Sequence, residues 1–249
     1  GGDAAVRGFD RSAPPGPLVV KDSTIQSSGR GILWGYSKLD VESVFITDTL
    51  WHGISGNTLE LFMTASSIDH SIFGVGIYIK DAGLFNPVQI TSTSTFANPL
   101  GGILAINSVV EVEQGVFFDN GIANIRLTGS AMSVKNSIID GAVPEAGTGK
   151  FGDGVVVMPL TAASTLEMEN TAITDSGRAG ISNFGSHVAL KDILIQCAAF
   201  DLADQFIPKD LFGPGLPPQD LSTTYDDQGG NACGCPVADS RCLAVPAGL

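Results

Sequence analysis

The chain has 249 residues, of which 43% are hydrophobic, 16% are charged and 31 are glycine. This is enough apolar material for one large domain or two ordinary ones, and the glycine content suits an all-β protein with many tight turns. The formal net charge of −13 argues against nucleic acid as a partner, because phosphate binding needs clustered Lys and Arg. No run of about 18 apolar residues is present, so we expect no membrane span.

Residues 1–17 do not show a regular pattern. They include the Pro-rich stretch SAPPGP, and we expect an irregular segment here, or a broken first repeat that ends near Ala5 and Val6. The opening GGDAAVRGFD lacks the features of a signal peptide, and no amphipathic cap precedes the repeats. We therefore expect the natural chain to extend further upstream.

Residues 18–202 contain a loose repeat of 22 residues, which two kinds of anchor reveal. The first anchor is the first apolar residue of an alternating stretch, and the second is the apolar residue of a Gly-Ile-like pair. The usual interval is 15 residues from first to second anchor and 7 residues from there to the next first anchor. The first anchors are Leu18, Leu39, Leu61, Val88, Val110, Met132, Leu166 and Val188, and the second are Ile32, Ile54, Ile77, Ile103, Ile125, Val155, Ile181 and Phe200.

A fixed period of this length is typical of solenoids. Each unit has three short strand-like stretches, is too short for a propeller blade and lacks the spacing of leucine-rich repeats. We therefore predict an all-β solenoid of about eight coils, each with three short strands that stack on their equivalents about 4.8 Å away. Inward positions should form apolar ladders such as Leu39, Leu61, Val88 and Val110. We expect positive φ angles at the glycines that precede the Ile anchors, which are Gly31, Gly53, Gly76, Gly102, Gly154 and Gly180.

Residues 203–249 differ in kind from the repeats. They are rich in proline, at Pro208, Pro214, Pro217 and Pro218, and then carry the cysteine cluster NACGCPVADSRC. We expect residues 203–222 to cap the open end of the solenoid, because an exposed strand edge invites aggregation.

Four cysteines are present: Cys197, Cys233, Cys235 and Cys242. Three of them lie in the tail, where we expect a disulfide that staples the segment. Reduced thiols or a metal site are the alternatives, and the spacing does not determine the pairing. A disulfide implies an oxidising compartment, so we expect an extracellular or cell-surface protein.

The period and the ladder pattern of residues 18–202 resemble those of the right-handed parallel β-helix superfamily, which includes pectate lyases and polygalacturonases. The resemblance implies a right-handed solenoid, and it implies polysaccharide cleavage as an alternative activity. Ile68, Asp69 and His70 match the core of a pectate lyase motif, but the arginine-rich segment of those lyases has no counterpart here. The Gly-His-Gly and Arg-Ile-Lys segments of polygalacturonases are also missing. We therefore interpret His70 as an ordinary corner residue.

Candidate catalytic residues cluster around an insertion into the repeat. In solenoids, insertions usually build the binding face, and here they fall at Lys80–Asn86, Ala142–Gly152 and Pro159–Ser164. Carboxylates near the second insertion suit the acid and base of glycoside chemistry. The candidates are Asp119, Asp140, Asp153, Asp175 and Arg178.

Three of these aspartates, Asp119, Asp140 and Asp175, also suggest Ca²⁺, which takes six to eight oxygen ligands. The alternative is that they only form turns, because Asp after a strand accepts hydrogen bonds from turn amides. The same turn position holds Ser27, Ala97 and Cys197 in other repeats, so the acidic row is interrupted. We therefore expect no metal or other cofactor.

Aromatic residues of the first repeats are the candidates for sugar binding. Exposed aromatic rings stack on sugars, whereas buried ones fill the core. Trp51 replaces small or polar residues at its place in the unit, so we expect it to point outward, together with His52 and Tyr78. Trp34 shares its position with Ile79, which indicates the core.

We therefore predict a non-catalytic solenoid that presents a long face for binding or adhesion. The predicted partners are a polysaccharide or another surface protein. A polysaccharide lyase or glycoside hydrolase with its site at the Ala142–Gly152 loop is the alternative.

Overall fold

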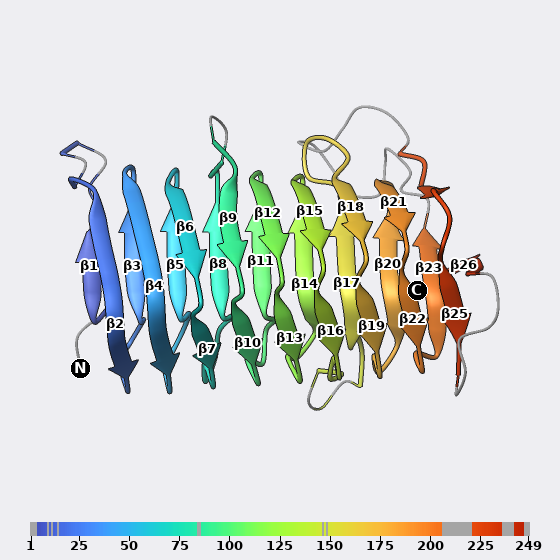
Figure 1. The fold of residues 1–249 in the computed structure, drawn as a ribbon, viewed down its shortest axis with the longest axis horizontal. Helices are drawn as coiled ribbons and strands as arrows, with labels where there is room; N and C mark the ends of the chain where they lie inside the picture. The colour runs from blue at the N-terminus through green and yellow to red at the C-terminus, as the bar shows by residue number, and fades with distance from the viewer. Residues whose placement is uncertain are drawn as a thin grey trace.

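The structure, a computed structural model, describes residues 4–8, 10, 12–13, 15–83, 86–145, 147, 149–205, 221–235 and 242–246. Within these ranges the chain forms β-strands and no helix, so no helix that could cross a membrane is found among them. All paired strands in this part of the chain are parallel. They stack along the long axis of the molecule, from the blue N-terminal end to the red C-terminal end (Figure 1). This confirms the predicted all-β solenoid of stacked coils.

Each coil contributes one short strand to each of three faces. Face 1 is a 10-stranded sheet made of β1 (Val6–Gly8), β3 (Ile32–Gly35), β5 (Ile54–Asn57), β8 (Ile77–Lys80), β11 (Ile103–Ile106), β14 (Ala123–Thr128), β17 (Asp153–Met158), β20 (Ala179–Phe184), β23 (Phe200–Gln205) and β26 (Ala244–Pro246). Face 2 consists of β6 (Glu60–Thr64), β9 (Val88–Thr91), β12 (Val109–Glu113), β15 (Ala131–Lys135), β18 (Thr165–Glu169), β21 (His187–Lys191) and β24 (Thr224–Asp227). Face 3 consists of β7 (Ser67–Asp69), β10 (Ser94–Phe96), β13 (Val116–Phe118), β16 (Ile138–Asp140), β19 (Ala172–Thr174), β22 (Leu194–Gln196) and β25 (Ala232–Gly234).

Faces 2 and 3 are joined at the N-terminal end of the solenoid. There β2 (Leu18–Gln26) and β4 (Lys38–Thr47) run through both faces without a break, so the two faces form one 16-stranded sheet. From β6 onward a bend separates them, and in Figure 1 the strands of face 2 lie in the upper half and those of face 3 in the lower half.

The core consists of apolar ladders that run along the solenoid axis. Leu39 aligns with Leu61, and Val88 aligns with Val110, as the repeat predicts. These four side chains are at most 1% exposed. Each coil covers the apolar face of its neighbours, so burial stabilises a coil only when adjacent coils are present.

The glycines before the Ile anchors serve a different purpose from the one predicted. Gly31, Gly53 and their equivalents are not among the described residues that have a positive φ angle. The prediction of positive φ at these glycines is therefore wrong. Close packing requires glycine instead. A Cβ at Gly31 would lie 2.4 Å from the carbonyl oxygen of Gly53 and 2.6 Å from Ile46 Cγ2. Only a residue without a side chain lets the backbones of adjacent coils approach this closely.

The stacked strands extend beyond the boundaries 18–202 expected for the repeat. At the N-terminal end β1 pairs with β3, and at the C-terminal end β24, β25 and β26 pair with β21, β22 and β23. Residues 224–246, which carry three of the four cysteines, therefore contribute strands to all three faces. Most of the expected cap, residues 206–220, lies outside the described residues, so capping stays a prediction.

Two disulfides hold this last set of strands. Cys197 bonds to Cys235, and Cys233 bonds to Cys242. Cys197 and Cys235 follow the aligned strands β22 and β25, so their bond joins two successive coils. Cys233 is fully buried and aligns with Ile195 in the core. The predicted tail disulfide is confirmed.

Candidate functional site

The predicted row of turn residues lies at the corner where the chain passes from face 3 to face 1. Asp48, His70, Asp119 and Asp175 all have φ between 48° and 54° there. Asp tolerates this left-handed conformation better than most residues because its short polar side chain bonds locally. The conformation therefore gives a structural reason for aspartate at this position.

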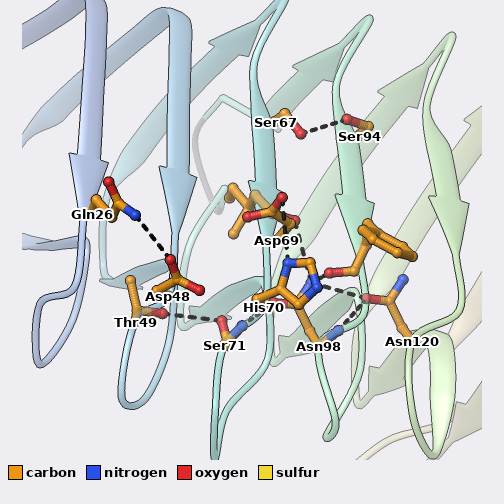
Figure 2. Close-up of polar contacts among 12 residues, drawn as sticks. Gln26, Asp48, Thr49, Ser67, Asp69, His70, Ser71, Ser94, Asn98 and Asn120 are labelled. Carbon is orange, nitrogen blue, oxygen red and sulfur yellow. Dashed lines mark hydrogen bonds and ion pairs between the residues drawn. The ribbon is translucent and has the colours of Figure 1, made fainter.

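A column of buried polar side chains lies directly inside this corner (Figure 2). Thr49 and Ser71 share a hydrogen bond of 3.1 Å, and the Ser71 amide donates to Asn98 Oδ1 at 3.1 Å. Asn98 Nδ2 donates to Asn120 Oδ1 at 2.9 Å, and Asn120 Nδ2 donates to Asn124 Oδ1 at 2.7 Å. This column was not predicted, although Thr49, Ser71, Asn98 and Asn120 directly follow the turn residues and so recur with the repeat.

Asp119, Asp140 and Asp175 lie on neighbouring turns without converging. Asp140 accepts a hydrogen bond of 2.5 Å from Thr174 Oγ1, while Asp119 and Asp175 are exposed. Among the described residues, no three His, Cys, Asp or Glu side chains form a group that could hold a metal ion. The three aspartates therefore do not form such a group, and calcium binding stays an untested alternative.

Asp153 and Arg178 form a buried ion pair. The Arg178 Nε donates to Asp153 Oδ1 at 2.8 Å, and a second guanidinium nitrogen donates to Oδ2 at 2.5 Å. The carboxylate is fully buried and also accepts the Ala179 amide at 3.2 Å. The hydrogen bonds that Arg178 donates to Asp153 raise the pKa of Arg178. With both carboxylate oxygens held by protein donors, the pair has the features of a structural element.

The candidate sugar-binding aromatics do not form one platform. Trp51 points outward as predicted, with 46% of its surface exposed, and its ring lies 6.1 Å from that of Phe73. His52 stacks on Tyr78 at 5.1 Å instead, and its Nδ1 accepts the Val75 amide. Burial, followed by the charge of Arg30, lowers the pKa of His52 from 6.5 to about 4. His52 therefore stays neutral and holds a turn.

His70 is an exposed corner residue. Its ring packs edge-on against Phe96 at 5.2 Å, and its Nδ1 lies 3.5 Å from Asp69. Phe96 in turn stacks on Phe118 of the next coil at 4.3 Å. The ring contact to Phe96 gives His70 a packing role at this corner.

A groove on face 2 gathers more polar side chains than any of the predicted sites. It combines two hollows of about 320 and 130 Å³ that share Ser133 and Lys135. It crosses β9, β12, β15, β18 and β21. The outward-pointing polar side chains that these five strands contribute to it are Gln89, Thr91, Glu111, Glu113, Ser133, Lys135, Glu167, Glu169 and Lys191. We call these nine residues the face 2 groove.

Strand register places the charged groups of the groove in columns. Glu113, Lys135, Glu169 and Lys191 follow one another across four adjacent strands. Glu169 contacts Lys191 at 2.5 Å and Lys135 at 3.6 Å. The hydrogen bond from Lys191, then its charge, lowers the pKa of Glu169.

The face 2 groove was not predicted from the sequence, because the repeat is defined by its inward positions and the groove lies on outward ones. The signal is the pair of alternating stretches EVE at Glu111 and EME at Glu167. In both, the apolar residue points into the core, so the two glutamates point outward. Only the alignment of β12, β15 and β18 shows that these residues share one surface.

No protein-family model and no curated protein matches the chain. Among solved structures, pectate lyase Pel9A is similar with a TM-score of 0.58 and 12% identity, over 95% of this chain and 67% of that chain. The catalytic unit of the thermostable GH87 alpha-1,3-glucanase from Streptomyces thermodiastaticus strain HF3-3 is similar with a TM-score of 0.51 and 13% identity. That match covers 92% of this chain and 50% of the glucanase unit. The chain therefore has a right-handed parallel β-helix fold.

Proposed function

We propose that this protein is a secreted or cell-surface β-helix that binds a neutral polysaccharide along the face 2 groove without cleaving it. The observation that carries the proposal is the groove itself, in which polar side chains repeat in register over five strands. The two disulfides support an oxidising compartment.

The spacing of the groove suits an extended glycan. Neighbouring strands are about 4.8 Å apart, which is comparable to the length of one sugar unit in an extended chain. A polysaccharide that runs along the solenoid axis therefore meets a new set of side chains at each unit. Glu and Gln oxygens accept hydrogen bonds from sugar hydroxyls, whereas Lys and Gln nitrogens donate to sugar oxygens.

The charge of the groove favours a neutral glycan. Four glutamates line it against two lysines, Lys135 and Lys191. Glu169 contacts both ammonium groups, and its charge offsets part of their attraction for an acidic sugar. The net charge of −13 adds a long-range repulsion for polyuronates.

The comparisons support a carbohydrate ligand at the level of the fold only. The similar structures are a pectate lyase and an alpha-1,3-glucanase. A fold by itself hosts many functions, so the proposal depends on the groove.

One observation favours the enzyme alternative. Glu111 and Glu167 face outward in one column with Ser133 between them. Two strand spacings place their Cα atoms roughly 10 Å apart, near the upper limit for the acid and base of inverting glycosidases, about 9.5 Å between carboxyl groups. Both side chains are exposed, however, and burial is what keeps a catalytic carboxylic acid protonated at neutral pH.

The proposal is tested by calorimetric titration with hexasaccharides of neutral α-1,3-glucan, neutral β-1,4-glucan and oligogalacturonate. We expect a neutral glycan to bind and the oligogalacturonate not to bind. Glu111→Gln should weaken binding about tenfold, because a hydrogen bond to a charged group is worth about 1.5–3 kcal/mol. Glu42→Gln, on the same face but outside the groove, is the matched control and should bind as the wild type does.

Two outcomes would contradict the proposal. One is the absence of binding for all three hexasaccharides, and the other is equal binding by wild type and Glu111→Gln. Reducing ends are counted in the same samples, and we expect no increase with time. An increase that disappears in Glu111→Gln and Glu167→Gln would establish the enzyme alternative instead.

A further inference from the structure

We infer that a second pocket, separate from the face 2 groove, binds a single neutral sugar ring. It has a volume of about 340 Å³ and lies at the corner between face 1 and face 2, near the N-terminal end of the solenoid. Its lining residues are Tyr36, Ser37, Lys38, Thr58, Leu59, Glu60, Asp81, Gly83 and Asn86. None of them belongs to the groove, so this inference does not rest on the proposed function.

Three successive corners build the pocket. Tyr36 lies in the turn between β3 and β4, and Thr58 lies in the turn between β5 and β6. Asp81 and Gly83 belong to the insertion at Lys80–Asn86, which the sequence analysis marked as a potential binding face. A Cβ at Gly83 would lie 2.1 Å from the Val109 carbonyl oxygen, and its φ is 74°. Only glycine fits there, so the backbone at Gly83 lies tightly against the next coil.

Each charged group of the pocket is held in place by a neighbour. Glu60 Oε1 accepts a hydrogen bond of 3.0 Å from Asn86, and Asp81 Oδ1 accepts one of 2.7 Å from Asn107. The Lys38 ammonium group lies 3.1 Å from Asp40 and 4.8 Å from the centre of the Phe62 ring. These contacts restrict the side chains before any ligand arrives, which lowers the entropy cost of binding.

This set of groups matches the chemistry of a sugar ring. Glu60 and Asp81 each keep a second oxygen that can accept from hydroxyl groups, while Lys38 and Asn86 supply donors. Leu59 also lines the pocket, but it is only 3% exposed, so recognition depends on the polar groups. The volume is at the lower end of the usual range for small-molecule pockets, roughly 300–1,000 Å³, which suits one ring better than a chain.

The charge balance indicates a neutral ligand. Two carboxylates face one ammonium group, which is already paired with Asp40. A uronic acid would bring a third carboxylate into the pocket. We therefore expect neutral hexoses to bind and hexuronates to be rejected.

The test is a titration of the isotope-labelled protein with glucose, galactose, mannose and glucuronate, followed by amide chemical shifts. We expect saturable shifts around the pocket with at least one neutral hexose and none with glucuronate. Asp81→Asn keeps a residue that tolerates the turn, at φ 51°, and should weaken binding about tenfold through the loss of a charge-assisted hydrogen bond. Lys38→Met is a second variant, which keeps an apolar stem over Phe62 and removes the donor.

Asp48→Asn is the matched control, because Asp48 occupies the same kind of turn, at φ 53°, at a different corner. It should bind as the wild type does. Thermal melts confirm that each variant is folded. The inference is overturned if no neutral hexose gives saturable shifts, if both Asp81→Asn and Lys38→Met bind as the wild type does, or if Asp48→Asn loses as much affinity. Because the probes are single rings and the variants lie outside the groove, failure here leaves the polysaccharide proposal standing.

Discussion

At the scale of single residues, local geometry explains most of the polar residues that recur with the repeat. The aspartates after the face 3 strands adopt a left-handed backbone conformation, and the glycines before the Ile anchors allow close contact between coils. Asp119 and Asp175 therefore have a reason to be present without any catalytic role. Asp153 differs, because it is a fully buried charge.

The Asp153–Arg178 pair leads to a prediction about stability. Arg178→Met leaves a buried carboxylate without its main partner, and we expect unfolding by urea to show a loss of about 3 kcal/mol. The double variant Asp153→Asn/Arg178→Met removes the unpaired charge and should recover part of that loss. Lys21→Met breaks the exposed contact between Lys21 and Glu42 and should leave stability unchanged. Equal stability of Arg178→Met and wild type would show that the pair has no structural role.

At the scale of the element, each corner of the solenoid is held by a column of buried polar side chains. At the corner between faces 3 and 1, the column begins with Thr49 and Ser71 and continues with asparagines (Figure 2). Serines form the column at the corner between faces 1 and 2, where the amides of Ser108 and Ser130 donate to the hydroxyls of Ser130 and Ser164. These bonds satisfy turn amides that no strand pairing reaches, and an unsatisfied buried amide is costly.

Asn120→Asp tests the asparagine column. The side chain of Asn120 donates to Thr95 and to Asn124, and a carboxylate can make neither bond. We expect a loss of about 3 kcal/mol in a urea titration, because two buried acceptors lose their donor. Asn170→Asp changes an exposed asparagine that donates to Asn136, and its stability should differ little from that of the wild type. If the two variants were equally stable, the column would be dispensable.

At the scale of the whole molecule, a disulfide attaches the C-terminal strands covalently to the coil before them. They carry less apolar surface than the central coils, since the partners of the core residues Val188 and Leu190 are Tyr225 and Asp227. The bond between Cys197 and Cys235 closes a loop with a sequence separation of 38. In the chain-entropy account, closing a loop of this size stabilises by about 4 kcal/mol.

The double variant Cys197→Ser/Cys235→Ser should therefore free the last strands without melting the solenoid. We expect faster amide exchange at Thr224–Asp227, while β12 and β14 exchange as in the wild type. Local opening of this kind is a normal property of weakly packed elements. Uniformly faster exchange over the whole chain would instead mean that the C-terminal strands fold as one unit with the rest.

The sequence by itself determined the fold, because a solenoid repeats one local rule. Residues one repeat apart occupy equivalent places once the insertions are allowed for, so the apolar ladders, the parallel stacking and the outward direction of Trp51 follow from the period. The C-terminal strands were not predicted, because the period is not regular there. Residues 203–223 interrupt the interval, and Tyr225 and Cys233 replace the usual aliphatic residues.

Only the tertiary structure decided which polar residues lie together. The acidic turn residues looked like a site in the sequence, yet Asp119, Asp140 and Asp175 do not gather into one cluster, and Asp153 is buried against Arg178. The face 2 groove and the corner pocket are each built from several coils, and their residues are up to 102 and 50 positions apart. Periodicity tells which way a side chain points. Whether neighbouring coils leave a hollow there depends on bends, insertions and side-chain contacts that the period does not contain.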